Sequence, residues 1–258
     1  MKRIIPVLLV QDGGLVKSVN FRKHNYIGDP INAVKIFNEK EVDEIVILDI
    51  SASKENRSPN IGMIREIASE AFMPLAYGGG ITTIEEVKDI LFQGVEKVVF
   101  NTLALNKPTI IAQTASRFGS SSTVVSIDVK KNIFGKWKIY SHLTNKSLNI
   151  DIAEYAKQMQ DLGAGELFLN SVDQDGTFKG FDLKLISKVS NAVQIPVIAC
   201  GGAANPNDLA YAIVMGGASA SAAGSMFVYQ NSNRAVLINY PEWENMQKII
   251  EIIKRNGH

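Results

Sequence analysis

Short apolar segments alternate with stretches of helical periodicity along the whole chain. Eight of these segments are rich in Val, Ile, Leu or Ala and are interpreted as strands: "IIPVLLV", "EIVILDI", "MPLAY", "KVVFN", "TVVSID", "ELFLN", "IPVIAC" and "ASASAAG". A candidate helix follows each of them. Nearly continuous apolar strands are typical of a parallel sheet covered on both faces. Eight such units in 258 residues predict one α/β domain, a single (βα)8 TIM barrel that spans residues 1–258.

The segments between the strands carry helix signals. The clearest is "IDIAEYAKQMQDLGAG", which we expect to end at Gly163 and to bury one apolar face made of Ile152, Tyr155, Ala156, Met159 and Leu162. Asp29-Pro30 and Asn205-Pro206 each place a capping residue before a proline, which predicts two further helix starts. An open doubly wound sheet is the alternative architecture, but no linker rich in Pro, Gly or Ser divides the chain into two domains.

Two pairs of similar segments recur at one spacing. "MPLAYGGG" from Met73 matches "IPVIACGG" from Ile195, and "DEIVILDIS" matches "GELFLNSVD" through Glu44 and Glu166. Both pairs lie 122 residues apart, so we expect two repeated half-barrels of four units each.

Composition restricts the classes of partner. The chain has 27 Lys and Arg against 26 Asp and Glu, so no long-range field of one sign attracts nucleic acid or a membrane. A single cysteine and three histidines without a Cys/His cluster predict neither a disulfide nor a metal site. The apolar run at the start is too short to span a membrane and lacks a cleavage-type ending. We therefore expect a cytoplasmic protein with no metal, no cofactor, no nucleic-acid partner and no membrane association.

Glycine runs end the third and seventh strands, in "GGGIT" and "CGGAAN". Ligands bind such barrels at the C-terminal ends of the strands, where glycine lets backbone amides close tightly on a phosphate. The neighbouring strands end in small polar loops, with Asn101 and Thr102 in one half and Gly224 and Ser225 in the other. The repeat therefore predicts two phosphate sites on opposite sides of the barrel mouth.

Five aspartates at this rim are acid–base candidates: Asp12, Asp49, Asp128, Asp173 and Asp175. Turn or helix-capping roles are the ordinary explanation for most of them. Asp128 differs because it interrupts a buried run at the end of a strand, where an unpaired charge is costly. The turn "DQDGT", at residues 173–177, fits a plain turn and a catalytic loop equally well.

Four charges of alternating sign lie at the opposite ends of the strands: Arg3, Glu44, Lys97 and Glu166. They could close a salt-bridged ring across the N-terminal opening of the barrel. From the pattern alone, ordinary rim charges that aid stability are the favoured explanation.

Together these motifs resemble the cyclase subunit of imidazole glycerol phosphate synthase, a (βα)8 enzyme of histidine biosynthesis built from repeated half-barrels. The likeness covers almost the whole chain through "KRIIP", "GDP", "VDEIVILDISAS", "GGGI", "FNTLAL", "SIDVK", "GAGELFLNSVDQDGT", "IPVIACGGAANP" and "GSMF". The resemblance implies a glutaminase subunit at the N-terminal face. Ammonia would then pass through the barrel to a bis-phosphorylated formimino ribonucleotide at the C-terminal face.

Site residues follow from the resemblance, position by position. The four charges match the family's gate to the ammonia passage, Glu96 matches an acidic residue at the glutaminase interface, and Asp128 matches the catalytic aspartate of the fifth strand. Groups around the phosphorylated substrate are matched by Gly79, Gly80, Asn101 and Thr102 on one side, and by Asp175, Gly176, Gly201, Gly202, Gly224 and Ser225 on the other.

The first strand departs from the family pattern. The family carries a second acid–base aspartate in "LDV.DG", whereas this chain reads "LLVQDG" and places Leu9 there. Loss of one positioned acid–base group costs about 10²–10⁴ in rate. Smaller departures are Cys200, where the family has serine, and Asn170, where it has threonine.

The leading hypothesis is therefore a specialised paralogue that still receives ammonia from a glutaminase. It would act with an ATP-dependent sugar amidotransferase in making acetamidino sugars of a surface polysaccharide. The alternatives are an authentic cyclase of histidine biosynthesis, in which Asp128 works with a water or Asp175, a sugar-phosphate isomerase, and a non-catalytic conduit subunit.

Overall fold

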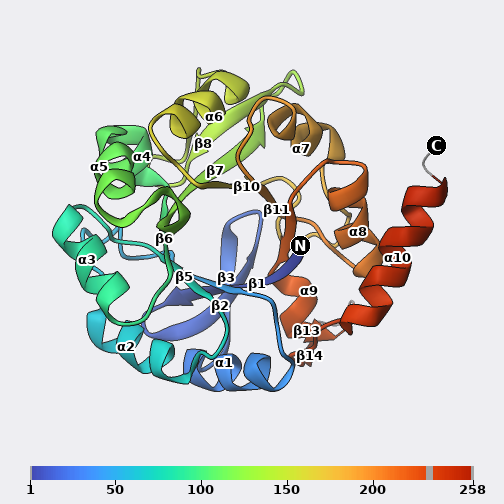
Figure 1. Cartoon of the computed structure of the whole chain (residues 1–258), viewed down its shortest axis with the longest axis horizontal. Helices are drawn as coiled ribbons and strands as arrows, with labels where there is room; N and C mark the ends of the chain where they lie inside the picture. Colours follow the sequence, from blue (N-terminus) through green and yellow to red (C-terminus); the bar gives the residue numbers. More distant parts are fainter. Residues whose placement is uncertain (1, 231–234, 257–258) are drawn as a thin grey trace.

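Eight parallel strands form a closed barrel in the computed structural model, which describes residues 2–230 and 235–256 (Figure 1). β12 pairs with β1 and β10 pairs with β7, so the ring has no open edge. The predicted barrel is confirmed, and the open sheet is wrong. The barrel strands are β1 (Arg3–Gln11), β4 (Ile45–Asp49), β5 (Leu75–Gly78), β6 (Lys97–Phe100), β7 (Thr123–Lys131), β10 (Glu166–Ser171), β11 (Val197–Cys200) and β12 (Ala220–Ala223).

Helices surround the barrel on its outer side (Figure 1). The longer ones are α1 (Pro30–Glu39), α2 (Ile61–Glu70), α3 (Ile84–Phe92), α5 (Thr109–Phe118), α6 (Ile152–Asp161), α7 (Leu183–Ser190), α8 (Pro206–Val214) and α10 (Trp243–Asn256). Short elements complete the chain: α4 (Thr102–Asn106), the 3₁₀ turn η1 (Ser120–Ser122), α9 (Ser225–Val228), β13 (Tyr229–Gln230) and β14 (Ala235–Val236). None of the described helices is long and apolar enough to cross a membrane.

The helix signals in the sequence are confirmed. Asp29 caps α1 by accepting a hydrogen bond from the Asn32 backbone amide, and Asn205 caps α8 in the same way, each with a proline as the first helical residue. The expected apolar face of α6 is buried at Ile152, Tyr155, Ala156 and Met159, whereas Leu162 follows the helix as its C-cap and is partly buried. These faces pack on the barrel strands and build the main core.

A β-hairpin stands between the first strand and the first helix of each half, where the sequence analysis expected a helix directly. β1 leads into the hairpin β2 (Gly14–Val19) and β3 (Arg22–Gly28), and β7 leads into β8 (Trp137–Ser141) and β9 (Lys146–Leu148). The same insertion at equivalent positions agrees with the predicted half-barrel repeat. Both hairpins rise at the C-terminal end of the barrel, where the strands that bear them end.

The inside of the barrel is a second, smaller apolar core. Its members alternate along the strands with residues of the outer core, as the pleat requires. They are Ile5, Val7, Val46, Ala76, Val99, Val124, Phe168, Ile198, Cys200, Ala220 and Ala222, with Leu9 and Leu48 packed against them. This layer separates the two polar ends of the barrel.

Candidate functional site

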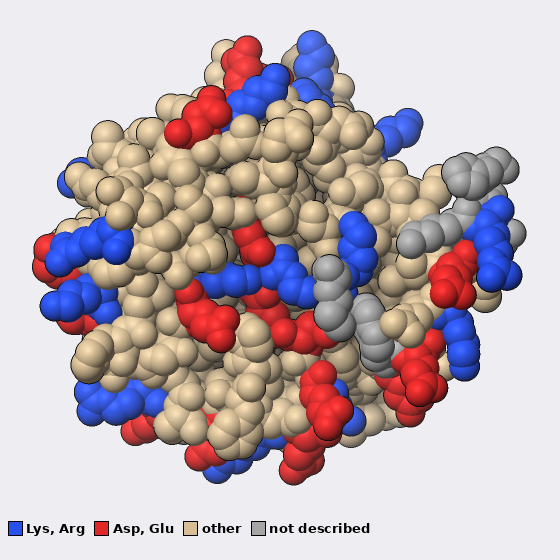
Figure 2. Space-filling view, in the orientation of Figure 1, with Lys and Arg blue, Asp and Glu red and all other residues tan. Residues whose placement is uncertain are grey.

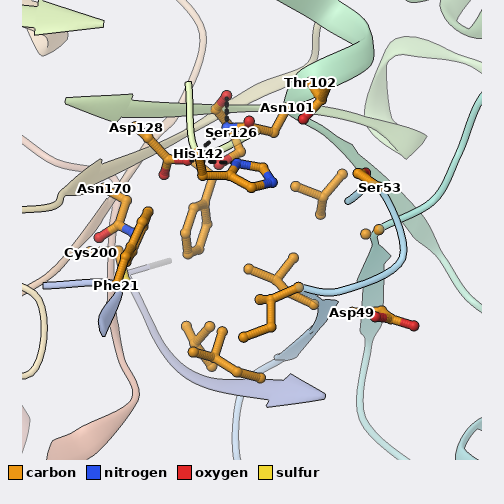
Figure 3. Close-up of a pocket in the computed structure, with 18 of the residues that line it drawn as sticks. Phe21, Asp49, Ser53, Asn101, Thr102, Ser126, Asp128, His142, Asn170 and Cys200 are labelled. Atoms are coloured by element: carbon orange, nitrogen blue, oxygen red, sulfur yellow. Dashed lines mark hydrogen bonds and ion pairs between the residues drawn. The ribbon is translucent and has the colours of Figure 1, made fainter. Parts of the chain in front are cut away.

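A pocket of about 150 Å³ opens at the C-terminal end of the barrel (Figure 3). Strand ends from both halves contribute to its wall, and both hairpins lean over it. Phe21 of the first hairpin and Tyr140 of the second are in ring contact, with centroids 6.5 Å apart. The pocket therefore joins the two halves of the molecule, as ligand sites of such barrels do.

Paired glycines with positive φ stand at the same place in each half. Gly79 and Gly80 have φ of +118° and +72°, and Gly201 and Gly202 have φ of +96° and +111°. A Cβ atom at Gly79 would lie 2.3 Å from the Asp49 carbonyl oxygen, so no other residue fits without movement of the backbone. The duplicated loops thus share a conformation that only glycine adopts readily.

The two sets of residues predicted to bind phosphate differ in how many of their members line the pocket. Gly79, Gly80, Asn101 and Thr102 all line the pocket. Of the second group only Asp175 and Gly224 line it, while the other members lie outside its lining: Gly176, Gly201, Gly202 and Ser225.

Glycines of the second group are closely packed by other loops. The Ser18 carbonyl oxygen would lie 2.3 Å from a Cβ atom at Gly176, and the Gly180 carbonyl oxygen 2.2 Å from one at Gly202. Gly176 therefore packs against the first hairpin, and Gly202 packs against another loop of the second half. The assignment of the second group as a phosphate site stays a prediction.

Asp128 is buried at the pocket, with 6% of its surface exposed. Asn101 Nδ2 donates to Asp128 Oδ2 at 3.1 Å and also reaches the Ser126 carbonyl oxygen at 3.2 Å. His142 Nδ1 lies 3.8 Å from the same carboxylate oxygen (Figure 3). Asn101, for which the resemblance predicts a phosphate contact, therefore holds the buried carboxylate in place.

Leu9 faces the pocket and brings no proton-transfer group to it. It pairs in register with Leu48 of β4, so this side of the pocket is hydrocarbon. Asn170 and Cys200, the other departures from the family pattern, line the pocket as well. All three changes noted in the sequence thus meet in one cavity.

Three residues of the pocket wall carry buried oxygen atoms that have no hydrogen-bond partner among the described residues. They are Asn101 Oδ1, Asn170 Oδ1 and Ser18 Oγ. Buried polar atoms are rarely left unpaired in folded proteins. Their position indicates groups available to a polar ligand.

Lys17 of β2 is a buried cation that sequence reasoning missed. Its Nζ donates to the Val7 carbonyl oxygen at 2.7 Å, beside Gly224. Burial lowers the pKa of Lys17 to about 8, against the opposing effect of Asp175. Burial also raises the pKa of Asp175 to about 6, which Lys17 opposes and Asp128 reinforces. A lysine within the strand-like run "GLVKSV" was the available signal.

The other rim aspartates have structural partners. Asp49 accepts from the Ser51 and Ala52 backbone amides at 3.1 and 3.0 Å and pairs with Arg57 at 3.1 Å. Asp173 accepts from the Lys131 amide at 2.7 Å, and Asp12 is exposed in the turn after β1. The ordinary explanation as turn and capping residues fits these three.

The four charges at the N-terminal end form a closed ring. Arg3 bonds Glu44 and, through Nη2, Glu166 Oε1 at 2.8 Å. Lys97 Nζ lies 2.9 Å from both Glu44 oxygens and 3.2 Å from Glu166 Oε2. Burial opposes the charge of Arg3, yet the two glutamates raise its pKa above the ordinary value. Figure 2 shows acidic and basic side chains side by side over the centre of the barrel.

The surface around this ring is partly apolar. Glu96 is exposed directly before Lys97. Phe72, before β5, and Phe92, at the end of α3, expose 89% and 84% of their surfaces. Segments that lead from helices into barrel strands lie at the N-terminal end, so both aromatic side chains lie at the same end of the barrel as the ring of charges.

The fold and the site define a (βα)8 barrel of two repeated halves, with a pocket between them at the mouth. Residues 3–233 match the family described as histidine biosynthesis protein, and the chain belongs to that family.

Curated relatives agree along nearly their full length. A protein of Pseudomonas aeruginosa, provisionally named imidazole glycerol phosphate synthase subunit hisF2, is 48% identical over 93% of this chain and 96% of its own. One of Vibrio vulnificus, provisionally named subunit hisF3, is 46% identical over 97% and 96%. One of Leptospira interrogans, provisionally named subunit HisF, is 44% identical over 96% and 98%. Within the part of the chain that the structure describes, no cluster of three or more His, Cys, Asp or Glu residues could hold a metal ion.

Proposed function

We propose that this chain is the synthase subunit of a cytoplasmic glutamine amidotransferase complex. A glutaminase docks at the N-terminal end and releases ammonia, and the barrel delivers it to an acceptor at the C-terminal pocket. The acceptor pathway is acetamidino-sugar synthesis for a surface polysaccharide, with an ATP-dependent sugar amidotransferase as a further partner. The observation that carries the proposal is a closed ring of four charges below a pocket in which Leu9 replaces an acid.

The ring and the pocket lie close together along two strands. On β6 the inward residue after Lys97 is Val99, and on β10 the inward residue after Glu166 is Phe168. Val99 and Phe168 already line the pocket. Two residues of strand span only about 6–7 Å. A small neutral molecule such as ammonia would cross one apolar layer, whereas a cation would have to shed its water there.

The mouth suits a phosphorylated small molecule. Gly79 and Gly80 present backbone at the pocket with no side chain in the way, and Thr102 adds a hydroxyl. Lys17 supplies a buried positive charge on the opposite side. These features bind an anion locally, which a nearly neutral chain requires.

Leu9 favours the specialised function over ring closure. Ammonia delivery needs no proton shuttle on β1, whereas ring closure in the resembled family uses one. The hydrocarbon side formed by Leu9 and Leu48 can neither donate nor accept a proton.

An authentic cyclase of histidine biosynthesis is the second candidate. The names of the three relatives point to it, and so does Asp175. A carboxyl group whose pKa is raised to about 6 can exchange a proton near neutral pH. In that case Asp175 and Asp128 would share the acid–base work.

Co-purification from the native cell tests the proposal. We expect a glutaminase together with a sugar amidotransferase, and glutamine-dependent amidination of an acetamido sugar nucleotide by the three proteins with ATP. A glutaminase alone, with rapid turnover of the formimino ribonucleotide, would establish the cyclase. Recovery of the chain with no glutaminase would refute both functions.

A further inference from the structure

His142 stands directly after β8 and faces Asp128 across the second hairpin (Figure 3). Its Nδ1 is 3.8 Å from Asp128 Oδ2, and both residues line the pocket. The second ring nitrogen is turned toward the pocket interior (Figure 3). An imidazole with one nitrogen within ion-pair distance of a carboxylate and the other turned toward a ligand space can take up a proton from a bound ligand.

The fold produces this arrangement through strand register. β8 runs antiparallel to β7, with Val129 opposite Ile139 and Lys131 opposite Trp137. The chain therefore returns along β7 toward the barrel, which carries the residue after Ser141 back beside Asp128. Tyr140 fixes the hairpin, because its hydroxyl bonds Asn145 Oδ1 at 3.1 Å and its ring contacts Phe21.

Asp175 is the other acid–base candidate at this pocket. Several further titratable groups of the pocket have partners or surroundings of their own. Lys17 donates to the Val7 carbonyl oxygen, and Asp49 is held by Arg57. Burial raises the pKa of Cys200 far above its ordinary value, so its thiol keeps its proton. His24 lines the pocket from the first hairpin rather than beside Asp128.

We propose that His142 is the second acid–base residue of this pocket and that it acts as a pair with Asp128. The inference rests on the ammonia-dependent function proposed above. As the lone pair of ammonia forms a bond to an electrophilic carbon of the acceptor, the π pair of that carbon moves to its heteroatom. One N–H proton then passes to Nε2 of His142, and the Asp128 carboxylate balances the imidazolium.

Turnover by single variants tests the acid–base role. The full chain is supplied with ammonium chloride and with either the formimino ribonucleotide or the acetamido sugar nucleotide, sugar amidotransferase and ATP. We expect His142→Ala to slow product formation about 10²-fold and added imidazole to restore part of it. Thr144→Ala, at an exposed position of the same hairpin, should keep the wild-type rate.

The conservative variant separates chemistry from positioning. His142→Asn keeps an amide near the place of Nδ1 but cannot accept a proton. We expect it to be as slow as His142→Ala. A wild-type rate in either variant would overturn the proposal.

Nitrogen NMR of the full chain tests the pairing without turnover. We expect Asp128→Asn to shift the Nδ1 signal of His142 and to leave the His24 signals in place. An unmoved His142 signal would overturn the pairing. If the wild-type chain forms no product from either acceptor, the proposed function fails, and the NMR result alone decides whether His142 and Asp128 are paired.

Discussion

In the first half-barrel the leading strand, β1, contributes Leu9 to the pocket, whereas in the second half the equivalent strand, β7, contributes Asp128. Each strand continues into a β-hairpin over the pocket, but the first hairpin brings Lys17 and the second brings His142. The glycine loops of the two halves share their positive φ angles.

The halves therefore share a backbone plan and differ in single side chains. Backbone shape here depends on close contacts such as Gly79 against Asp49, which tolerate little change. Side chains that point into a cavity have no such neighbours and can differ freely. The comparison teaches that the first half supplies an apolar wall and a cation to the pocket, and that the second half supplies the two groups to which we assign proton transfer, Asp128 and His142.

The largest expected effect comes from Asp128→Asn. The change keeps the shape and the contact with Asn101 but removes the charge, so ammonium-dependent product formation should fall about 10²–10⁴-fold. Steady-state assays of the purified chain measure it. Asp12→Asn, in the exposed turn of the other half, is the control and should retain the wild-type rate. An active Asp128→Asn variant would mean that the chain is a conduit.

The charged ring is the next test, because Glu166 of the second half bonds Arg3 and Lys97 of the first. Glu44 exposes only 2% of its side chain, so Glu44→Gln leaves two cations underpaired and should lower the free energy of unfolding by about 3 kcal/mol. Urea denaturation measures this cost.

A surface pair gives the control for the ring. Glu70→Gln, which breaks the exposed contact with Lys35 at 3.4 Å, should cost less than about 1 kcal/mol. In the glutaminase complex, Glu44→Gln should reduce glutamine-dependent turnover more than ammonium-dependent turnover. Equal losses would argue against a gate.

Leu9→Asp places an acid on the first half where the second half has one. We expect turnover of the formimino ribonucleotide to rise about tenfold, part of the effect of a positioned acid–base group. Leu48→Asp, at the paired position on β4, is the matched control and should bring no gain. A folded Leu9→Asp variant without any gain would show that Leu9 is not what limits ring closure.

The smallest effect concerns the buried cation of the first hairpin. The pKa of Lys17 is lowered to about 8 in the folded chain, so the folded state holds its proton less tightly than the unfolded state. The contribution of Lys17 to the free energy of unfolding is therefore present at high pH and is lost as the pH falls through about 8. Between about pH 7 and pH 9 it should add about 1 kcal/mol.

The Lys17→Met variant lacks this titrating group, so its comparison with the wild-type protein isolates the contribution of Lys17 to the free energy of unfolding. Urea denaturation of both proteins at the two pH values should show a smaller rise in stability with pH for the variant. An identical rise in both proteins would mean that the pKa of Lys17 is not depressed by burial.

The local pattern of apolar and polar residues was enough to predict the barrel architecture. Apolar strands such as "EIVILDI" bury both faces only in a parallel sheet covered by helices, and the 122-residue repeat indicated two halves. Asp128 was singled out because a charge inside a buried run is costly. The four ring charges could be named, but their bonding depended on the closed barrel.

Tertiary structure alone decided the partners of the buried carboxylate. The hairpin register brings His142 back to Asp128, and contact between the hairpins places Phe21 against Tyr140. Sequence periodicity reports which face of an element is buried but not which distant side chain lies opposite. The alternation of apolar strands and helical segments in the sequence therefore determined a barrel with a ligand site at one end. Only strand register and packing determined which side chains line that site together with Leu9.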